Sequence, residues 1–282
     1  MSFELVQTTT EPARLEAHRA LFARCFPEAT HFTPQYLQWL YAENPAGQVV
    51  GVDAMVGDRL AATYVTIPAR LRVEGSSVRG LLSLNTATDP DFQGKGLFTR
   101  LATAVFERSA AAGYGAVYGV ANANSTPGFV RKLGFQLLEP LRAAVGWGPS
   151  YCRHLEGAWR EARLVREWPA EDLAWRQRNP ANPLTARGRP GGLTEFRGAT
   201  GYPLLHATAF LPGRFAEEAG QGWAPSVYIG VVPAAFRRRG AYLDVPDRLR
   251  PSPLNLIFRS LAGAPSPSAG QSFISFLDFD AF

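Results

Sequence analysis

The stretch that decides the fold reads Leu84-Asn85-Thr86-Ala87-Thr88-Asp89-Pro90-Asp91-Phe92-Gln93-Gly94-Lys95-Gly96-Leu97-Phe98-Thr99-Arg100-Leu101. Its beginning is typical of a β-strand, Asp89–Asp91 breaks that strand, and the apolar stripe from Leu97 onward predicts a helix. The first N–H groups of a helix lack partners within it and carry a partial positive charge. Because Gly94 and Gly96 let the backbone approach a ligand closely, the stretch predicts a pyrophosphate site with Lys95 at its rim.

Two other kinds of phosphate-binding loop fit this stretch less well. A nucleoside-triphosphate loop requires Ser or Thr directly after Gly-Lys, whereas Gly96 follows here. A dinucleotide loop requires a third glycine, and Thr99 stands at that position. The two glycines alone are also compatible with an ordinary strand–turn–helix corner, so the interpretation depends on the surrounding sequence.

The residues around this stretch alternate between predicted strands and helices. We expect strands at 3–7, 48–55, 60–73, 78–88 and 116–121, and helices at 11–25, 33–41 and 97–112. Thr33-Pro34 predicts an N-cap followed by a proline in the first turn. Short connections at Gly57-Asp58 and Glu74-Gly75 predict antiparallel pairing of the strands they join.

The second half of the chain is richer in proline and glycine, yet it echoes the first. The sequence at 36–39 and 44–46 resembles that at 172–175 and 179–181, with Trp39 matching Trp175 and Asn44-Pro45-Ala46 matching Asn179-Pro180-Ala181. A segment starting at Tyr118 resembles one starting at Val227. This similarity predicts duplication of a whole domain, with a boundary near 147–150. We expect a final strand over 273–282.

Composition and charge narrow the classes of function. The net charge of +5 favours anionic ligands, but the one tight basic run is Arg237-Arg238-Arg239, which is a weak signal for nucleic acid. We see no signal peptide, no apolar run long enough to span a membrane and no metal-ligand spacing, and Cys25 and Cys152 lie far apart. We therefore expect a cytoplasmic protein that binds no metal, no nucleic acid and no membrane. The sequence leaves the oligomeric state open.

Residues 84–101 closely resemble the acetyl-coenzyme A signature of the GNAT superfamily of N-acetyltransferases, Q/R-x-x-G-x-G/A after a strand. Residues 122–135 resemble the Asn-containing loop, helix and terminal Gly-Phe that follow in this family. The resemblance implies an α+β fold of two GNAT-like domains, each a mixed, mostly antiparallel sheet flanked by helices. Residues 1–147 would bind acetyl-coenzyme A. Residues 148–282 would be a degenerate copy that lacks the phosphate loop and shapes the acceptor site.

The resemblance also implies where the coenzyme lies. In the family, the strand before the loop splays from its neighbour, which frees backbone groups for the pantetheine arm, and the start of the next helix binds the pyrophosphate. The residues that carry these roles here are Thr86, Ala87, Thr88, Gln93, Gly94, Lys95, Gly96, Leu97, Phe98, Thr99, Asn124 and Phe129.

Two positions depart from the family pattern. Phe98 stands where the family usually has Gly or Ala, so its ring must find room. Val130 stands where the family often has a tyrosine that protonates the departing thiolate, and neither Val130 nor Phe129 can donate a proton. The usual acid is therefore absent or supplied from elsewhere.

The expected reaction is direct transfer of an acetyl group from acetyl-coenzyme A to a primary amine, for which a base removes the ammonium proton. Glu43 lies in the helix-end segment that borders the acceptor site in the family, although it also fits a solvated carboxylate. Tyr118 lies on the strand beside the gap, although it also fits a core tyrosine. Asn85 is placed to contact substrate from the splayed strand.

The remaining polar candidates are weaker. The histidines are scattered singly and are expected at the surface or in satisfied core positions; they are His18, His31, His154 and His206. Some relatives bring a C-terminal segment to the active site, which leaves Asp278 and Asp280 open. Two alternatives remain at this point: an acyl or aminoacyl transferase of the same superfamily, and a coenzyme-binding protein without catalysis. We expect a small-molecule amine as the acceptor, whose identity the sequence does not give.

Overall fold

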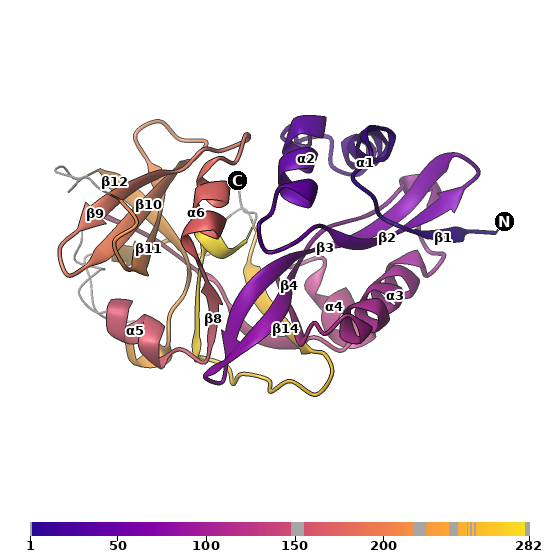
Figure 1. Ribbon diagram of the computed structural model, residues 1–282. Helices are drawn as coiled ribbons and strands as arrows, with labels where there is room; N and C mark the ends of the chain where they lie inside the picture. The colour runs from indigo at the N-terminus through magenta and orange to yellow at the C-terminus, as the bar shows by residue number, and fades with distance from the viewer. Residues whose placement is uncertain are drawn as a thin grey trace.

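A long twisted β-sheet runs through the computed structural model, with helices packed on both of its faces (Figure 1). The structure describes residues 2–147, 155–216, 224–236, 242–246, 248, 250 and 252–279. The expected domain boundary near 147–150 and the basic run Arg237–Arg239 therefore lie largely outside the described residues, as do Cys152 and His154. None of the helices in the described ranges has the length and apolar character needed to span a bilayer.

The first half of the chain contains the strands and helices that the sequence predicts, together with a helical turn at 90–92 and two strands over 136–147 that it does not predict. They are β1 (Glu4–Gln7), α1 (Pro12–Cys25), α2 (Pro34–Ala42), β2 (Val50–Val56), β3 (Arg59–Val73), β4 (Ser76–Thr88), η1 (Pro90–Phe92), α3 (Leu97–Ala111), β5 (Ala116–Asn122), α4 (Thr126–Leu133), β6 (Gln136–Pro140) and β7 (Arg142–Trp147). Thr33 caps α2 as expected, because its Oγ1 accepts a hydrogen bond from the Tyr36 N–H at 3.1 Å.

The second half is also built from alternating helices and strands. They are α5 (Leu155–Glu161), β8 (Leu164–Glu167), α6 (Ala170–Gln177), β9 (Thr185–Arg189), β10 (Leu193–Ala199), β11 (His206–Pro212), β12 (Pro225–Val231), η3 (Ala234–Phe236), β13 (Tyr242–Asp244), β14 (Leu254–Ser260), β15 (Ser272–Ser275) and η5 (Phe276–Asp278).

The final strand is shorter than the sequence pattern predicts. It ends at Ser275, so the prediction of a strand over 273–282 is wrong over residues 276–279. The Asp278 carboxylate accepts hydrogen bonds from the Ser275 N–H at 2.7 Å and from the Ser275 hydroxyl at 2.9 Å. This capping box turns the chain into η5 and ends the strand. Residues 280–282 lie outside the described residues.

The fifteen-residue strand β3 makes the sheet continuous between the two halves. It pairs antiparallel with β4 along one edge, while its other edge pairs first with β2 and then, over Arg70–Val73, with β8 of the second half. Helices α3 and α4 pack on one face of the first-half strands, and α1 and α2 pack on the other (Figure 1). The first half therefore has a mixed, mostly antiparallel sheet with helices on both faces.

Two strands are exchanged between the halves. Strand β14 lies between β5 and β6 of the first half and pairs antiparallel with both. Strand β7, the last of the first half, lies between β12 and β13 and pairs antiparallel with both. The expected division into residues 1–147 and 148–282 therefore does not separate two sheets, because each half supplies one strand to the other.

With these exchanges the two halves have matching strand orders. The first reads β3-β4-β5-β14-β6 and the second reads β10-β11-β12-β7-β13. In both, the second and third strands are parallel and the other neighbours are antiparallel. The sequence similarity between Asn44 and Asn179 also has a structural counterpart, because each side-chain oxygen accepts a hydrogen bond from the N–H two residues later.

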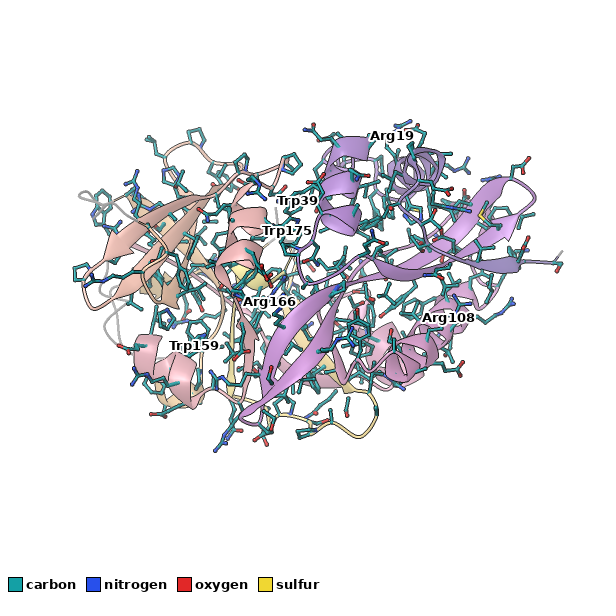
Figure 2. All side chains as sticks on the ribbon, in the orientation of Figure 1. Arg19, Trp39, Arg108, Trp159, Arg166 and Trp175 are labelled. Atoms are coloured by element: carbon teal, nitrogen blue, oxygen red, sulfur yellow. The ribbon has the colours of Figure 1, made fainter. Side chains whose placement is uncertain are left out.

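Two tryptophans join the halves at the contact of α2 with α6. The indole rings of Trp39 and Trp175 stack at 4.6 Å between centroids with 14° between their planes (Figure 2). Each indole N–H donates to the backbone carbonyl of the other tryptophan at 3.0 Å. Such a reciprocal contact is what a two-fold relation between α2 and α6 produces.

A buried carboxylate fixes α1 to the sheet. Asp53 on β2 accepts hydrogen bonds from His18 at 3.1 Å, from Thr63 at 2.7 Å and from Thr8 at 2.9 Å. Burial on its own would raise the pKa of Asp53, but these hydrogen bonds and the nearby His18 outweigh it and hold the pKa below its usual range.

We expect Trp39→Ala and Trp175→Ala each to lower the free energy of unfolding by about 3–5 kcal/mol, because each removes a large buried side chain. The double variant should lose less than the sum of the two, since both substitutions remove the same stacking contact and its hydrogen bonds. Urea unfolding of the four proteins measures this. Strict additivity would contradict the reciprocal contact.

Asp53 should make the protein sensitive to acid. Its folded-state pKa is lowered, so its stabilising contribution is present above the unfolded-state pKa of about 4 and is lost as the pH falls through the folded-state value. Asp53→Asn should therefore cost about 1–3 kcal/mol at pH 7 and progressively less below pH 4. Denaturant unfolding from pH 7 to pH 3 checks this, and an equal loss at every pH would show that the Asp53 charge is not involved.

Candidate active site

The most consequential feature of the first half is a gap between the parallel strands β4 and β5. Their pairing runs from Gly80 opposite Ala116 to Ser83 opposite Gly119 and stops there. Beyond that point β4 continues to Thr88 beside β3, and β5 continues to Asn122 beside β14. Part of the inner backbone edge of each strand therefore faces an opening in the sheet.

A β-bulge in β4 accounts for the divergence. Val65 of β3 faces Leu84, but Thr63 faces Ala87, so Asn85 and Thr86 together oppose the single residue between Thr63 and Val65. Asn85 adopts a φ of 47°, in the left-handed region. A bulge bends its strand and increases the local twist, so β4 turns away from β5 here.

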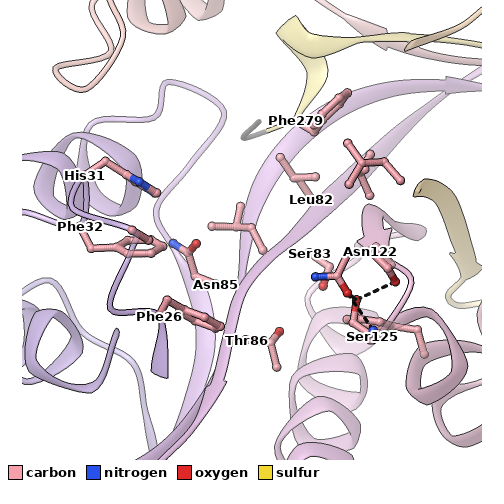
Figure 3. Close-up of a pocket in the computed structure, with 16 residues that line it drawn as sticks. Phe26, His31, Phe32, Leu82, Ser83, Asn85, Thr86, Asn122, Ser125 and Phe279 are labelled. Carbon is pink, nitrogen blue, oxygen red and sulfur yellow. Dashed lines mark hydrogen bonds between the residues drawn. The ribbon is translucent and has the colours of Figure 1, made fainter. Parts of the chain in front are cut away.

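The gap holds a cavity of about 480 Å³ (Figure 3). Its walls come from both open strands, the α1–α2 loop, α4, β14 and the C-terminal segment. The lining residues are Phe26, Ala29, His31, Phe32, Leu82, Ser83, Leu84, Asn85, Thr86, Val120, Ala121, Asn122, Ser125, Phe129, Leu254 and Phe279.

The glycine-rich loop follows the open end of β4 and leads into α3. Gly94 and Gly96 have φ values of 75° and 71°, and a Cβ at either position would meet nothing within 4 Å. Both glycines and Lys95 between them are exposed. Among the described residues, the N–H groups of Gly94, Lys95 and Gly96 donate to no protein acceptor, and those of the first turn of α3 have no partner within the helix. The loop thus presents an accessible row of donors suited to an anion.

Asp89 fixes the turn that precedes the glycine-rich loop. Its carboxylate accepts from the Asp91 N–H at 3.0 Å and is paired with Arg24 at 3.1 Å and with Arg59 at 2.7 Å. Asp91 is exposed and pairs with the same two arginines. Its hydrogen bond with Arg59 lowers the pKa of Asp91. The helical turn η1 is therefore fixed to α1 and β3 before the loop begins.

The ring of Phe98 finds its room against α4. It packs edge-to-face on Phe129, with 5.3 Å between ring centroids. Gly128 of the same helix also lies against the ring, because a Cβ at this position would stand 3.3 Å from Phe98 Cε1. The large residue at position 98 is thus matched by the absence of a side chain at position 128, and the ring does not occupy the loop.

Some of the residues that the resemblance assigns to the coenzyme line the cavity, and others lie outside its lining. Thr86 and Phe129 line the cavity, whereas Ala87 and Thr88 remain paired with β3 at its edge. Gln93 lies between them and the loop, with its Nε2 donating to the Thr88 carbonyl at 3.4 Å.

The strand-end asparagine that lines the cavity is Asn122 instead of Asn124. The Asn122 side-chain oxygen accepts from the N–H groups of Asn124 at 3.1 Å and Ser125 at 2.9 Å. This turn leaves Asn124 exposed and outside the lining. The sequence offers two asparagines at this strand end, and the turn decides which one faces inward.

The three candidate catalytic residues are not brought together. Asn85 lines the cavity, and its Nδ2 donates to the Tyr41 hydroxyl at 3.0 Å. Tyr118 does not line it, because its buried hydroxyl donates to the Asp278 carbonyl at 2.5 Å; burial raises the pKa of Tyr118 to about 12. Glu43 is the exposed C-cap of α2 and does not line it either. The geometry thus supports a role at the cavity for Asn85 alone among the three.

Several lining residues had no sequence signal. Phe26, His31 and Phe32 come from the α1–α2 loop, whose position depends on packing, and Leu254 arrives on the exchanged strand β14. Phe279 belongs to the C-terminal segment, for which the sequence left a role at the site open.

Buried side chains of the second half anchor this C-terminal segment. Arg176 donates to the carbonyls of Leu277 at 3.1 Å and Phe279 at 3.0 Å, and the Trp168 indole donates to Asp278 at 2.8 Å. Desolvation raises the pKa of Asp278. The segment therefore has a defined place beside the cavity.

In the second half, the corresponding gap between β11 and β12 is filled by strand β15. Strands β11 and β12 pair from His206 opposite Ser226 to Thr208 opposite Tyr228, after which Gly230 and Val231 pair with β15 instead. A Cβ at Gly230 would stand 2.2 Å from the Ile274 carbonyl oxygen. Among the described residues, no group of three or more His, Cys, Asp and Glu side chains is placed to hold a metal ion.

Comparison with known proteins agrees with this geometry. Residues 8–138 match the sequence model of the acetyltransferase (GNAT) domain family. No curated protein sequence matches the chain.

Solved structures of several acyltransferases share the fold. A probable N-acyltransferase of unknown function from Enterococcus faecalis aligns over 93% of this chain and 73% of its own, with a TM-score of 0.59 at 9% identity. A GCN5-related N-acetyltransferase from Anabaena variabilis aligns over 91% of this chain and 72% of its own, with a TM-score of 0.60 at 10% identity. The Saccharomyces cerevisiae N-myristoyltransferase with bound myristoyl-CoA aligns over 96% of this chain and 88% of its own, with a TM-score of 0.57 at 11% identity. At these identities the similarity concerns the fold, which is GNAT-like.

The packing of Phe98 on Gly128 gives a direct test of the loop's surroundings. Gly128→Val should cost about 1–3 kcal/mol of unfolding free energy, because its side chain collides with the Phe98 ring. The same substitution in a Phe98→Ala background should cost much less. Denaturant unfolding of the four proteins measures the coupling, and equal costs in both backgrounds would show that Phe98 does not fill this space.

Proposed function

We propose that this GNAT-type acyltransferase, whose residues 8–138 match the family model of the GNAT acetyltransferase domain, transfers an acetyl group from acetyl-coenzyme A directly to a primary amine of a small molecule. The observation that carries this proposal is the position of the donor-rich loop at the open end of the β4–β5 gap. The loop suits the pyrophosphate of the coenzyme, and the gap offers unpaired backbone to its pantetheine arm.

In this proposal the chain contributes chiefly by positioning. The N–H groups from Gly94 to Thr99 bind the pyrophosphate, and Lys95 adds a positive charge at the rim. The edge of β4 at Thr86–Thr88 aligns the arm so that the thioester lies in the cavity. Holding the amine beside the thioester carbonyl supplies much of the rate, because the reaction becomes effectively unimolecular. Asn85, fixed by the Tyr41 hydroxyl, is the polar side chain at the bend of β4.

We further propose that the chain is a tandem GNAT-like protein whose second half is a degenerate copy without a coenzyme site. The matching strand orders and the reciprocal Trp39–Trp175 contact support the duplication. The pairing of β15 with Gly230 and Val231 supports the loss of the second site, since it closes the equivalent gap. The second half then serves the first by placing Phe279 in the wall of the cavity.

A longer acyl donor is the second candidate. The apolar cavity lining favours it, and the chain shares its fold with an N-myristoyltransferase that binds myristoyl-CoA. Rates with acetyl-, octanoyl- and myristoyl-coenzyme A at a fixed amine concentration distinguish the two, because an acetyltransferase should be fastest with the shortest donor.

The coenzyme site is tested by Gly96→Asp. The substitution places a carboxylate among the donors that receive the pyrophosphate, and it strains a residue with a φ of 71°. We expect calorimetry to show at least a 100-fold loss of acetyl-coenzyme A affinity. Gly75→Asp is the matched control, because Gly75 has a φ of 83°, open space around it and a position at the opposite end of β4. Unchanged binding by Gly96→Asp, or no binding by the intact protein, would refute the proposed site.

A further inference from the structure

The cavity has two chemically different sides. Asn122 at the end of β5 and Ser125 at the N-cap of α4 form one side, and α4 packs against α3, the helix that follows the loop that we assign to the coenzyme. Phe26, His31 and Phe32 of the α1–α2 loop form the other (Figure 3). The bent part of β4 lies between them, so a coenzyme held on the first side leaves the second side for the acceptor.

We propose that this second side binds an amine carried on an apolar or aromatic body, and that His31 accepts the proton which the amine loses. This inference rests on the proposed function. It adds the class of acceptor amine and the general base, neither of which the proposed function assigns.

The acceptor class follows from the lining. Phe26 and Phe32 approach from the α1–α2 loop and Phe279 from the C-terminal segment, and none of the described lining residues is Asp, Glu, Lys or Arg. A polycationic amine placed here would meet no carboxylate among the described lining residues, and burying an unpaired charge is costly. An apolar or aromatic body gains instead from contact with the rings. Phe26 is 39% exposed, so this side is also open to an incoming molecule.

His31 is the one titratable side chain in the described lining of the cavity. It is half-buried, its ring lies 4.1 Å from that of Phe32 and 5.3 Å from that of Tyr36, and its ring nitrogens make no hydrogen bond with any described residue. His18, by contrast, is fully buried and bonded to Asp53. An imidazole is the side chain that most readily exchanges a proton near neutral pH, and the ring nitrogens of this one have no hydrogen-bond partner among the described residues.

Among the described residues, the ionisable groups near His31 are hydrogen-bonded, paired or exposed. Arg24 at the end of α1 is paired with Asp89 and Asp91. The Cys25 thiol donates to the Thr88 carbonyl, and Glu28 on the same loop is exposed. From α2 the facing group is Tyr36, and from β4 it is the uncharged Asn85.

The proton balance is complete with these groups. The imidazole takes one proton from the ammonium, directly or through a water, and the freed lone pair attacks the thioester carbonyl to form the C–N bond. When the C–S bond breaks, the thiolate leaves with its electron pair, and the second proton leaves the nitrogen to give neutral amide and thiol. The imidazolium then returns its proton to solvent.

The acceptor class is tested with the full chain, acetyl-coenzyme A and four probe amines, following release of free coenzyme A. We expect kcat/KM at least 10-fold higher for phenethylamine and hexylamine than for spermidine and kanamycin. Faster acetylation of either polycation would overturn the inference while leaving the acetyltransferase proposal intact. If no amine reacts, calorimetry on the coenzyme complex decides, because absent phenethylamine binding overturns the inference. Absent acetyl-coenzyme A binding overturns the proposed function itself.

The role of His31 is tested by His31→Gln, with His206→Gln on β11 as the control outside the cavity lining. We expect about a 100-fold lower kcat/KM for phenethylamine at pH 7 with unchanged coenzyme affinity, and a smaller loss near pH 10, where a much larger fraction of the amine is already neutral. Added imidazole should partly restore His31→Ala. A wild-type rate and pH profile in His31→Gln, or an equal loss in His206→Gln, would overturn the assignment.

Discussion

The structure depends on the loss of pairing between β4 and β5 beyond Ser83 and Gly119. Buried backbone N–H and C=O groups require hydrogen-bond partners. Where β4 and β5 diverge, neither strand supplies partners to the facing edge of the other, so those groups are left for a ligand. The bulge at Asn85 and Thr86 creates this condition, and the turn held by Asp89 then delivers the glycine-rich loop to the same end of the sheet. One local irregularity thus produces both an unpaired edge and an anion-binding loop beside it.

The second half shows what happens to the same architecture when the gap is closed from within. The chain places β15 against Gly230 and Val231, and it turns at η5 so that Phe279 reaches the cavity of the first half. Tyr118 and Tyr228, which occupy corresponding strands, both direct their hydroxyls to carbonyls of this segment, Asp278 and Ile274. The C-terminal segment therefore closes one gap and completes the wall of the other, which explains why Tyr118 is structural.

Much of the first half could be predicted from the sequence, because its signals are local. The apolar stripe of α3, the cap at Thr33 and the glycines of the loop each follow from residues within a few positions of one another. The exchange of β7 and β14 could not, since an alternating strand pattern does not state which neighbour the strand pairs with. The choice of Asn122 over Asn124 depends on a turn.

His31 was missed for a related reason: its place at the cavity is set by how the α1–α2 loop packs. The family resemblance supplied the coenzyme side of the site, where loop and strand are continuous in sequence. It did not supply the acceptor side, whose walls come from the α1–α2 loop and the C-terminal segment, which lie far apart in the sequence.

Amide hydrogen exchange with and without acetyl-coenzyme A reports on the unpaired backbone groups of the β4–β5 gap themselves. We expect slower exchange at Gly94–Thr99 and along Thr86–Thr88 when the coenzyme is present, with no change in β11 and β12. Unchanged exchange at the loop and the β4 edge, or protection that appears between β11 and β12 instead, would contradict the proposed coenzyme site.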